Sequence, residues 1–191
     1  MAGKSHSEPL SIRMDPRIKT SAAELQKQFD AAIEVSRRQA EISEAQRSVK
    51  EVLLQARQLR SKVSENAALA SALDAFIEKA EDVAGAPADR FGVVPSKPAK
   101  DHEDLESLHS KFARIFSAVN DGDSAPTVDA MQAFGTAQTD LVAVMAKWKA
   151  FTSKELPAVN GQLRQAGLAP IAIGAQGPSP VEKDPDESDA N

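Results

Sequence analysis

The chain has 191 residues, no Cys, no Tyr, seven Phe and one Trp, and its 28 acidic against 23 basic residues give a net charge of −5. The absence of Cys excludes disulfides, Cys-ligated zinc, iron–sulfur clusters and thiol catalysis, and the acidic balance argues against a nucleic-acid binder. The length suits one domain with tails, no apolar run approaches the roughly 18 residues of a membrane span, and the first residues contain no apolar segment of the secretory-signal type.

Residues 1–20 are expected to form an N-terminal arm. Within it, Leu10, Ile12 and Met14 alternate with polar residues, which is the period of a half-buried β-strand. A strand needs a neighbour to satisfy its backbone hydrogen bonds, and no other segment of this sequence has a strand pattern. Two interpretations stay open: a floppy arm, or the last strand of a β-domain that precedes this segment in a longer protein.

Residues 17–84 contain neither Gly nor Pro, which predicts helix rather than strands separated by turns. Ser21 and Glu24 have the spacing of a capping box, so a helix is expected to begin near Ser21. Two apolar stripes with heptad spacing follow, out of phase with each other. They comprise Leu25, Phe29, Ala32 and Ser36, then Ile42, Ala45, Val49, Val52, Ala56, Leu59 and Val63. We predict one long helix with a local bend around residues 38–42; a break is the alternative, since residues 43–46 also resemble a capping box.

A second helix is expected after a turn at residues 64–66, ending at Gly85 in the position of a helix C-cap. A loop over residues 86–100 follows, and its apolar centre, residues 91–94, is expected to fold back against the helices. The stripe of this second helix is Leu69, Leu73, Phe76, Ala80 and Val83.

A third helix is predicted from Asp101 to Asn120, and a fourth from residues 124–127, with Pro126 in its first turn. Pro157 lacks an amide donor and predicts a kink or restart before a short helical piece that ends at Gly167. The stripes are Leu105, Leu108, Phe112, Ile115 and Val119, then Met131, Phe134, Gln138, Leu141, Met145 and Trp148.

Four amphipathic helices with no strand between them predict an all-α fold, an antiparallel four-helix bundle over residues 21–171 with a long first helix. Residues 172–191 are rich in Gly, Pro, Ser and acidic residues and are expected to be a disordered tail. The tail holds five acidic residues against one Lys, so most of the net charge of the chain belongs to it.

Segments at both ends of the helical part carry a family resemblance. Residues 9–21 read PLSIRMDPRIKTS, and residues 154–171 read KELPAVNGQLRQAGLAPI. Both resemble the C-terminal region of large bacterial extracytoplasmic β-propeller proteins, labelled glycosyl hydrolases of the BNR-repeat, sialidase-like or sortilin-like type. The resemblance implies that residues 9–15 end a small β-sandwich and that the remainder is the terminal helical domain. No Asp-box of the propeller occurs in the chain, so no propeller residue is carried over.

The resemblance implies a non-catalytic accessory or interaction domain whose partner is a protein, the β-propeller or β-sandwich region of the full-length relatives. It also implies a periplasmic or secreted location, although localisation is otherwise unknown from the sequence. The alternative is a free-standing helical adaptor or chaperone-like module that binds proteins through a bundle groove and the loop around Phe91. A hydrolase in its own right is the least supported interpretation. We expect no enzyme activity, cofactor, nucleic acid, membrane or small-molecule substrate.

No catalytic, cofactor-binding or metal-binding residue is assigned. His102, Glu106 and His109 would share one face of a helix that began at Asp101, and imidazole with carboxylate suits zinc. They flank the core stripe, however, where solvated residues are expected. Glu106 and His109 also form a single Glu-x-x-His, a motif that di-iron bundles use twice.

Three further features are considered as candidate sites. Trp148 with Met145 and Met131 resembles a ligand pocket, but their helical spacing favours core packing. Gln138 is polar at a core position, where it is expected to bond across the bundle and set its register. The basic residues of the first helix are interspersed with acids and lack aromatic neighbours, which disfavours a nucleic-acid face. They are Arg37, Arg38, Arg47, Lys50, Arg57, Arg60 and Lys62.

Overall fold

The computed structural model describes residues 8, 10, 11, 15–17, 19–85 and 102–174, and the regular structure of these residues is entirely helical. The elements are α1 (Ala22–Lys62), α2 (Ala67–Ala84), α3 (Leu105–Asn120), α4 (Val128–Ala150), the π-helical segment η1 (Phe151–Glu155) and α5 (Leu156–Gln165). The predicted all-α class is confirmed.

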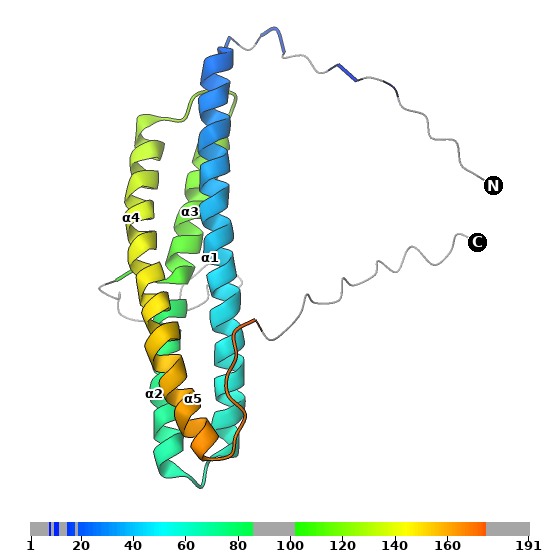
Figure 1. Ribbon diagram of the computed structural model, residues 1–191. Coiled ribbons are helices and arrows are strands. Elements are labelled where there is room, and N and C mark those ends of the chain that lie inside the picture. Colours follow the sequence, from blue (N-terminus) through cyan, green and yellow to red (C-terminus); the bar gives the residue numbers. More distant parts are fainter. Residues whose placement is uncertain (1–7, 9, 12–14, 18, 86–101, 175–191) are drawn as a thin grey trace, which may run out of the picture.

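The long helix α1 forms the spine of an antiparallel bundle (Figure 1). Helices α2 and α3 both pack against α1, one beyond the other along its length, and both run opposite to it. The succession α4, η1 and α5 runs back as one rod, with α4 against α3 and α5 against α2. The antiparallel bundle is therefore as predicted, and the end of α2 meets the α4–η1 junction halfway along the molecule.

The capping box at the start of α1 is present as predicted. The Ser21 amide donates to Glu24 Oε2 at 2.8 Å, and the Glu24 amide donates to Ser21 Oγ at 3.3 Å. The helix then continues unbroken for 41 residues, which confirms one long helix. Its continuity follows from the buried positions Ala31, Val35 and Ile42, which extend the heptad phase of the second stripe upstream without a shift.

The first predicted stripe of α1 is largely wrong as a core stripe. Phe29 is 60% exposed, Leu25 and Ser36 are half-buried, and only Ala32 packs against the core. The fully buried residues of this part of α1 are Ala31 and Val35. The phase change in the sequence therefore marks a second, outward apolar face of α1 rather than a bend in its core face.

Helix α2 follows the prediction in its cap, its stripe and its end. Asn66 Oδ1 accepts from the Leu69 amide at 3.1 Å, the five stripe residues are buried, and Gly85 ends the helix at φ +81°. The positive φ favours glycine at this turn, and a Cβ at Gly85 would lie against the carboxylate of Asp104.

The predicted start of α3 at Asp101 is wrong, because the helix begins at Leu105. Asp104 is the N-cap: its Oδ1 accepts from the Ser107 amide at 2.8 Å, and the Asp104 amide donates to Ser107 Oγ at 3.0 Å. This reciprocal cap satisfies the free amides three residues later than expected. The predicted stripe from Leu105 to Val119 is buried throughout.

The predicted stripe of α4 is partly wrong. Its buried residues are Ala130, Phe134, Ala137, Leu141 and Val144, whereas Met131 is 41% exposed. The Ala side chains of α4 at the contact are small, so α4 approaches α3 closely. The buried face of α4 is therefore displaced by about one residue from the stripe predicted from hydrophobicity. The N-cap is Thr127, so Pro126 precedes the helix instead of lying in its first turn.

Pro157 produces a π-helical segment instead of a break. The Leu156 amide bonds to the Phe151 carbonyl, one residue further back than in an α-helix, and α5 continues directly from there. The wider turn accommodates the missing Pro amide and its ring within a continuous rod. It also directs Phe151 into the core, 4% exposed, where its ring centroid lies 4.8 Å from that of Phe76 and 5.6 Å from that of Trp148.

Residues 166–174, which we call the C-terminal strap, return along α5 toward α1. Gly167 at φ +70° and the bond from the Leu168 amide to the Leu163 carbonyl form a Schellman end of α5. Asn160 then exchanges two hydrogen bonds of 2.8 Å with the backbone of Ile171, which is 2% exposed. These contacts give a structural role to Asn160, Gly167 and Ile171 of the sequence motif at residues 154–171.

Three expectations lie outside the described residues in whole or in part. The alternating strand includes residues 12–14, which are not described; of the rest, Leu10 is 86% exposed. The whole of the predicted loop around Phe91, residues 86–100, and nearly all of the predicted tail, residues 175–191, are also outside.

Candidate functional site

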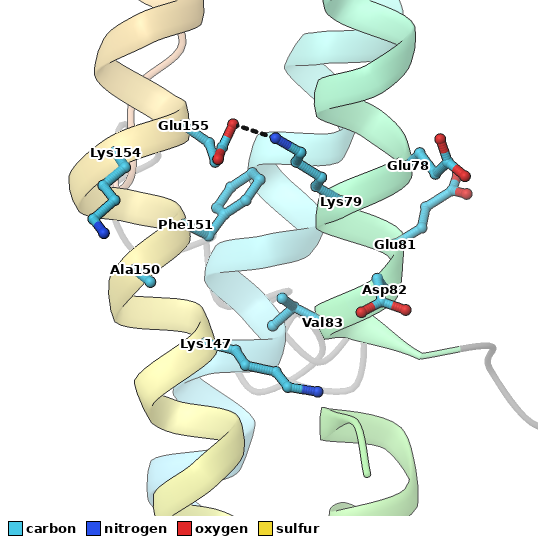
Figure 2. Close-up of a pocket in the computed structure, with 10 residues that line it drawn as sticks. All are labelled: Glu78, Lys79, Glu81, Asp82, Val83, Lys147, Ala150, Phe151, Lys154 and Glu155. Carbon is cyan, nitrogen blue, oxygen red and sulfur yellow. Dashed lines mark hydrogen bonds and ion pairs between the residues drawn. The ribbon is translucent and has the colours of Figure 1, made fainter. Parts of the chain in front are cut away.

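A groove of about 670 Å³ opens where α2 meets the α4–η1 junction (Figure 2). We call it the α2–η1 groove. Buried Phe151 forms its floor, and the rings of Phe76 and Trp148 both pack against Phe151. Its two walls come from different helices: Glu78, Lys79, Glu81, Asp82 and Val83 on α2, then Lys147, Ala150, Phe151, Lys154 and Glu155 on α4 and η1.

The charges of the α2–η1 groove are divided between its walls. Most of the acidic groups lie on α2, and two lysines lie on α4 and η1. Lys79 crosses the groove to Glu155 at 2.8 Å, and Figure 2 shows Lys147 extending from α4 toward α2. Glu81 is bound by Arg57 at 2.7 Å, so part of the acidic wall serves to join α2 to α1. Figure 2 shows Lys154 projecting away from α2, and Glu78 and Glu81 on the side of α2 away from η1. An aromatic floor with charged residues of both signs along its edges suits a polypeptide segment.

The expected common face of His102, Glu106 and His109 is not formed. Because α3 starts at Leu105, His102 precedes the helix, and its Nε2 lies 2.9 Å from Asp82 Oδ2 of α2. Glu106 instead accepts from Gln46 Nε2 of α1 at 3.0 Å. His109 Nδ1 is buried without a hydrogen-bond partner among the described residues. The three side chains thus contact different parts of the bundle.

The group around Trp148 is divided between core and surface. Trp148 and Met145 pack against the core, as the packing interpretation predicts, while Met131 lies on the exposed side of α4. Gln138 is half-buried, and its side chain makes no hydrogen bond to another described residue. The expected polar bond across the bundle is therefore not found within the described part of the chain.

The basic residues of α1 are largely engaged by neighbouring acids. Arg38 binds Glu34 at 2.8 Å, and Arg60 binds Asp74 of α2 at 2.6 Å through Nε. The hydrogen bond between Arg60 and Asp74 lowers the pKa of the Asp74 carboxyl from its ordinary value. These pairs are exposed and contribute little to stability individually.

Helices α3 and α4 are joined by a cluster of charges around Lys111. Its ammonium lies 2.8 Å from Glu103 and 2.7 Å from Asp140. The hydrogen bonds from Lys111 and from the Ser107 hydroxyl hold the pKa of the Glu103 carboxyl below its usual range. Partial burial lowers the pKa of Lys111, but the hydrogen bonds to Asp140 and Glu103 outweigh it, so the net shift is upward.

The largest surface feature that sequence reasoning misassigned is on α1. Leu25, Phe29 and Ile33 follow one another at four-residue spacing, and Phe29 and Ile33 are 60% and 38% exposed. We call these three residues the α1 outer face. The signal was present in the sequence as the out-of-phase stripe, but a stripe alone does not say whether it faces a core or solvent.

The chain matches no protein-family model, curated protein or solved structure. Among the described residues, no three His, Asp or Glu side chains are grouped as metal ligands would be. None of the helices in this part of the chain combines the length and apolarity needed to cross a membrane.

Proposed function

We propose that this chain is a non-catalytic helical interaction domain that packs on a β-rich region, the β-propeller or β-sandwich that the resemblance implies. The observation that carries the proposal is the α1 outer face. An aromatic ring exposed to 60% beside further aliphatic side chains is typical of a protein-binding surface. The face is also free of charge, since Ala22, Ser36 and Ala40 continue it along the helix.

The position of the face supports a partner at the N-terminal end of the bundle. Phe29 lies eight residues beyond the cap Ser21, or about 12 Å along the helix axis. A domain attached ahead of the arm would therefore be held close to this end of α1, where a short connection gives a high effective concentration. An interface of modest area suffices under those conditions.

The second candidate function is that of a free-standing adaptor, and the α2–η1 groove favours it. The groove offers an aromatic floor and charged residues of both signs along its edges, which suit an extended peptide. The two functions use different surfaces, so substitutions separate them: the accessory role depends on Phe29, and the adaptor role depends on Lys147.

The test begins with the DNA upstream of residue 1, which we expect to encode a β-propeller or β-sandwich in the same reading frame. Because the chain has no Cys, a single cysteine reports on one position alone. Ala22→Cys, on the same exposed face and with Phe29 retained, should react rapidly with a maleimide in the isolated chain and at least about tenfold more slowly in the longer protein, where the partner covers it.

Ser71→Cys, at an exposed position of α2, is the matched control and should react at the same rate in both proteins. Equal labelling of Ala22→Cys in the two proteins would contradict the proposal. So would an upstream sequence that encodes no β-rich domain in frame.

A further inference from the structure

Helix α4 lies at the edge of the bundle (Figure 1), and it carries a second exposed apolar surface. Val128 and Val142 are 74% and 71% exposed, and Met131 is 41% exposed. Between Ala130 and Ala146 the helix has a single charged residue, Asp140, which is bound to Lys111 of α3. We call the uncharged surface of Val128, Met131, Gly135, Thr139 and Val142 the α4 outer face.

The α4 outer face is symmetric about Gly135. Val128 and Val142 lie seven residues before and after it, which is about two turns in each direction. Two copies of this helix crossing antiparallel at Gly135 would therefore place Val128 of each copy against Val142 of the other.

Gly135 itself has no explanation within the described part of the chain. It lies inside α4 with ordinary helical geometry, and a Cβ built there would meet nothing within 4 Å. A helix-interior Gly costs about 0.5–1 kcal/mol relative to Ala. Because Gly has no side chain, it allows another backbone to approach closely, and an antiparallel crossing at this residue requires such an approach.

The charges at the two ends of α4 favour an antiparallel over a parallel arrangement of two paired copies. Asp129 lies in the first turn, shortly after Asp121 and Asp123, whereas Lys147 and Lys149 lie in the last turn. An antiparallel pair brings the acidic end of each copy beside the basic end of the other, and it also aligns the helix dipoles favourably. A parallel pair would juxtapose like charges.

We propose that the α4 outer face binds a second copy of this chain, forming an antiparallel two-fold dimer centred on Gly135. The contact is a single pair of helices and therefore belongs among small interfaces, with a dissociation constant in the range of about 1–100 µM. The dimer uses none of the residues of the α1 outer face, so it is independent of the proposed accessory function.

Sedimentation velocity from about 5 to about 500 µM brackets this range of affinity. The wild-type chain should shift from monomer to dimer, and Val142→Glu should weaken the dimer at least about tenfold by burying two unpaired carboxylates. Val142 is largely exposed, so this substitution leaves the fold intact, which circular dichroism checks. Ser71→Glu on α2 and Phe29→Glu on α1 add the same charge elsewhere and should leave the dimer unchanged.

Disulfide trapping tests the direction of the pair. Oxidation of a mixture of Val128→Cys and Val142→Cys should give mainly the mixed disulfide, because each cysteine faces the other in the antiparallel arrangement. A chain that stays monomeric throughout the concentration range overturns the proposal, as does a dimer that is insensitive to Val142→Glu. A preference for the two self-disulfides overturns the antiparallel arrangement.

Discussion

The side-chain amides of Asn160 and Gln55 hydrogen-bond to the backbone of the C-terminal strap, as a neighbouring strand would do in a sheet. Asn160 pairs with the amide and carbonyl of Ile171, and Gln55 pairs in the same way with Ala172, at 3.0 and 2.7 Å. An extended segment lying between two helices has no backbone partner, because helical amides and carbonyls are already bonded. Two carboxamides, each with a donor and an acceptor, satisfy the strap and seal Ile171 over the core.

Replacing Asn160 with Ala should lower the free energy of unfolding by about 1–3 kcal/mol, because it removes two hydrogen bonds and leaves a half-buried backbone amide and carbonyl unpaired. Urea denaturation measures the change. Asn120→Ala, which removes one exposed bond to the Phe116 carbonyl, is the matched control and should change stability by less than about 0.5 kcal/mol. Equal losses in the two variants would mean that the strap adds nothing to stability.

At the scale of elements, the π-helical segment η1 connects α4 to α5 without interrupting the rod. The extra residue in its turn changes the direction in which side chains project, so the core face of α4 passes from Val144 to Phe151 and then to Leu156 and Val159. Phe151 links α2 to the α4–η1 junction, because its ring contacts both Phe76 of α2 and Trp148 of α4. It also forms the floor of the α2–η1 groove.

Phe151→Ala should therefore destabilise the chain by about 3–5 kcal/mol, the usual cost of a large cavity in a core. The chain offers a matched residue in Phe29, which is 60% rather than 4% exposed. Phe29→Ala should change the stability of the isolated chain by less than about 0.5 kcal/mol. Thermal and urea unfolding of the two variants provide the measurement, and a large loss for Phe29→Ala would show that its ring belongs to the core.

At the scale of the whole molecule, the packing of α4 against α3 combines small apolar contacts with the charge cluster around Lys111. No polar or charged side chain of the described residues is fully buried, so the cluster lies at the edge of the interface. The pKa of Glu103 is lower in the folded chain than its unfolded value of about 4.3. The folded state thus binds fewer protons there, and stability is lost as pH falls through this range.

The melting temperature of the wild-type chain should accordingly decrease between about pH 4.5 and pH 3. In Lys111→Met the pKa of Glu103 returns toward its ordinary value, so the decrease over this range should be shallower although the variant is less stable at pH 7. Lys50→Met, at an exposed position of α1, should retain the wild-type slope. Parallel curves for wild type and Lys111→Met would contradict the assigned role of Lys111.

Prediction from sequence was most accurate where the cause is local. The Ser21 cap, the end of α2 at Gly85 and the end of α5 near Gly167 each depend on a few neighbouring residues, and each is found as expected. The start of α3 was misplaced because two acidic residues, Asp101 and Asp104, both suit an N-cap. Only the reciprocal bond between Asp104 and Ser107 distinguishes them.

The candidate sites were less predictable than the helices. Neither the α2–η1 groove nor the Lys111 cluster could be derived from spacing, because their residues lie far apart in sequence and meet only when α2 and α3 pack along α1. The interpretation of His102, Glu106 and His109 as one helix face failed for a related reason. A shift of the helix start by a few residues removed His102 from the helix.

The sequence by itself determined that this chain is helical, where most of its helices begin and end, and which heptad positions of α2 and α3 are apolar. Those properties follow from capping, from glycine and proline, and from periodicity, which act within a turn or two of chain. Only the tertiary structure decided which of two apolar stripes on α1 and α4 faces the core. Burial of either stripe would lower the free energy of the folded chain. Which stripe is buried is therefore determined by the positions of the neighbouring helices and not by the stripe itself.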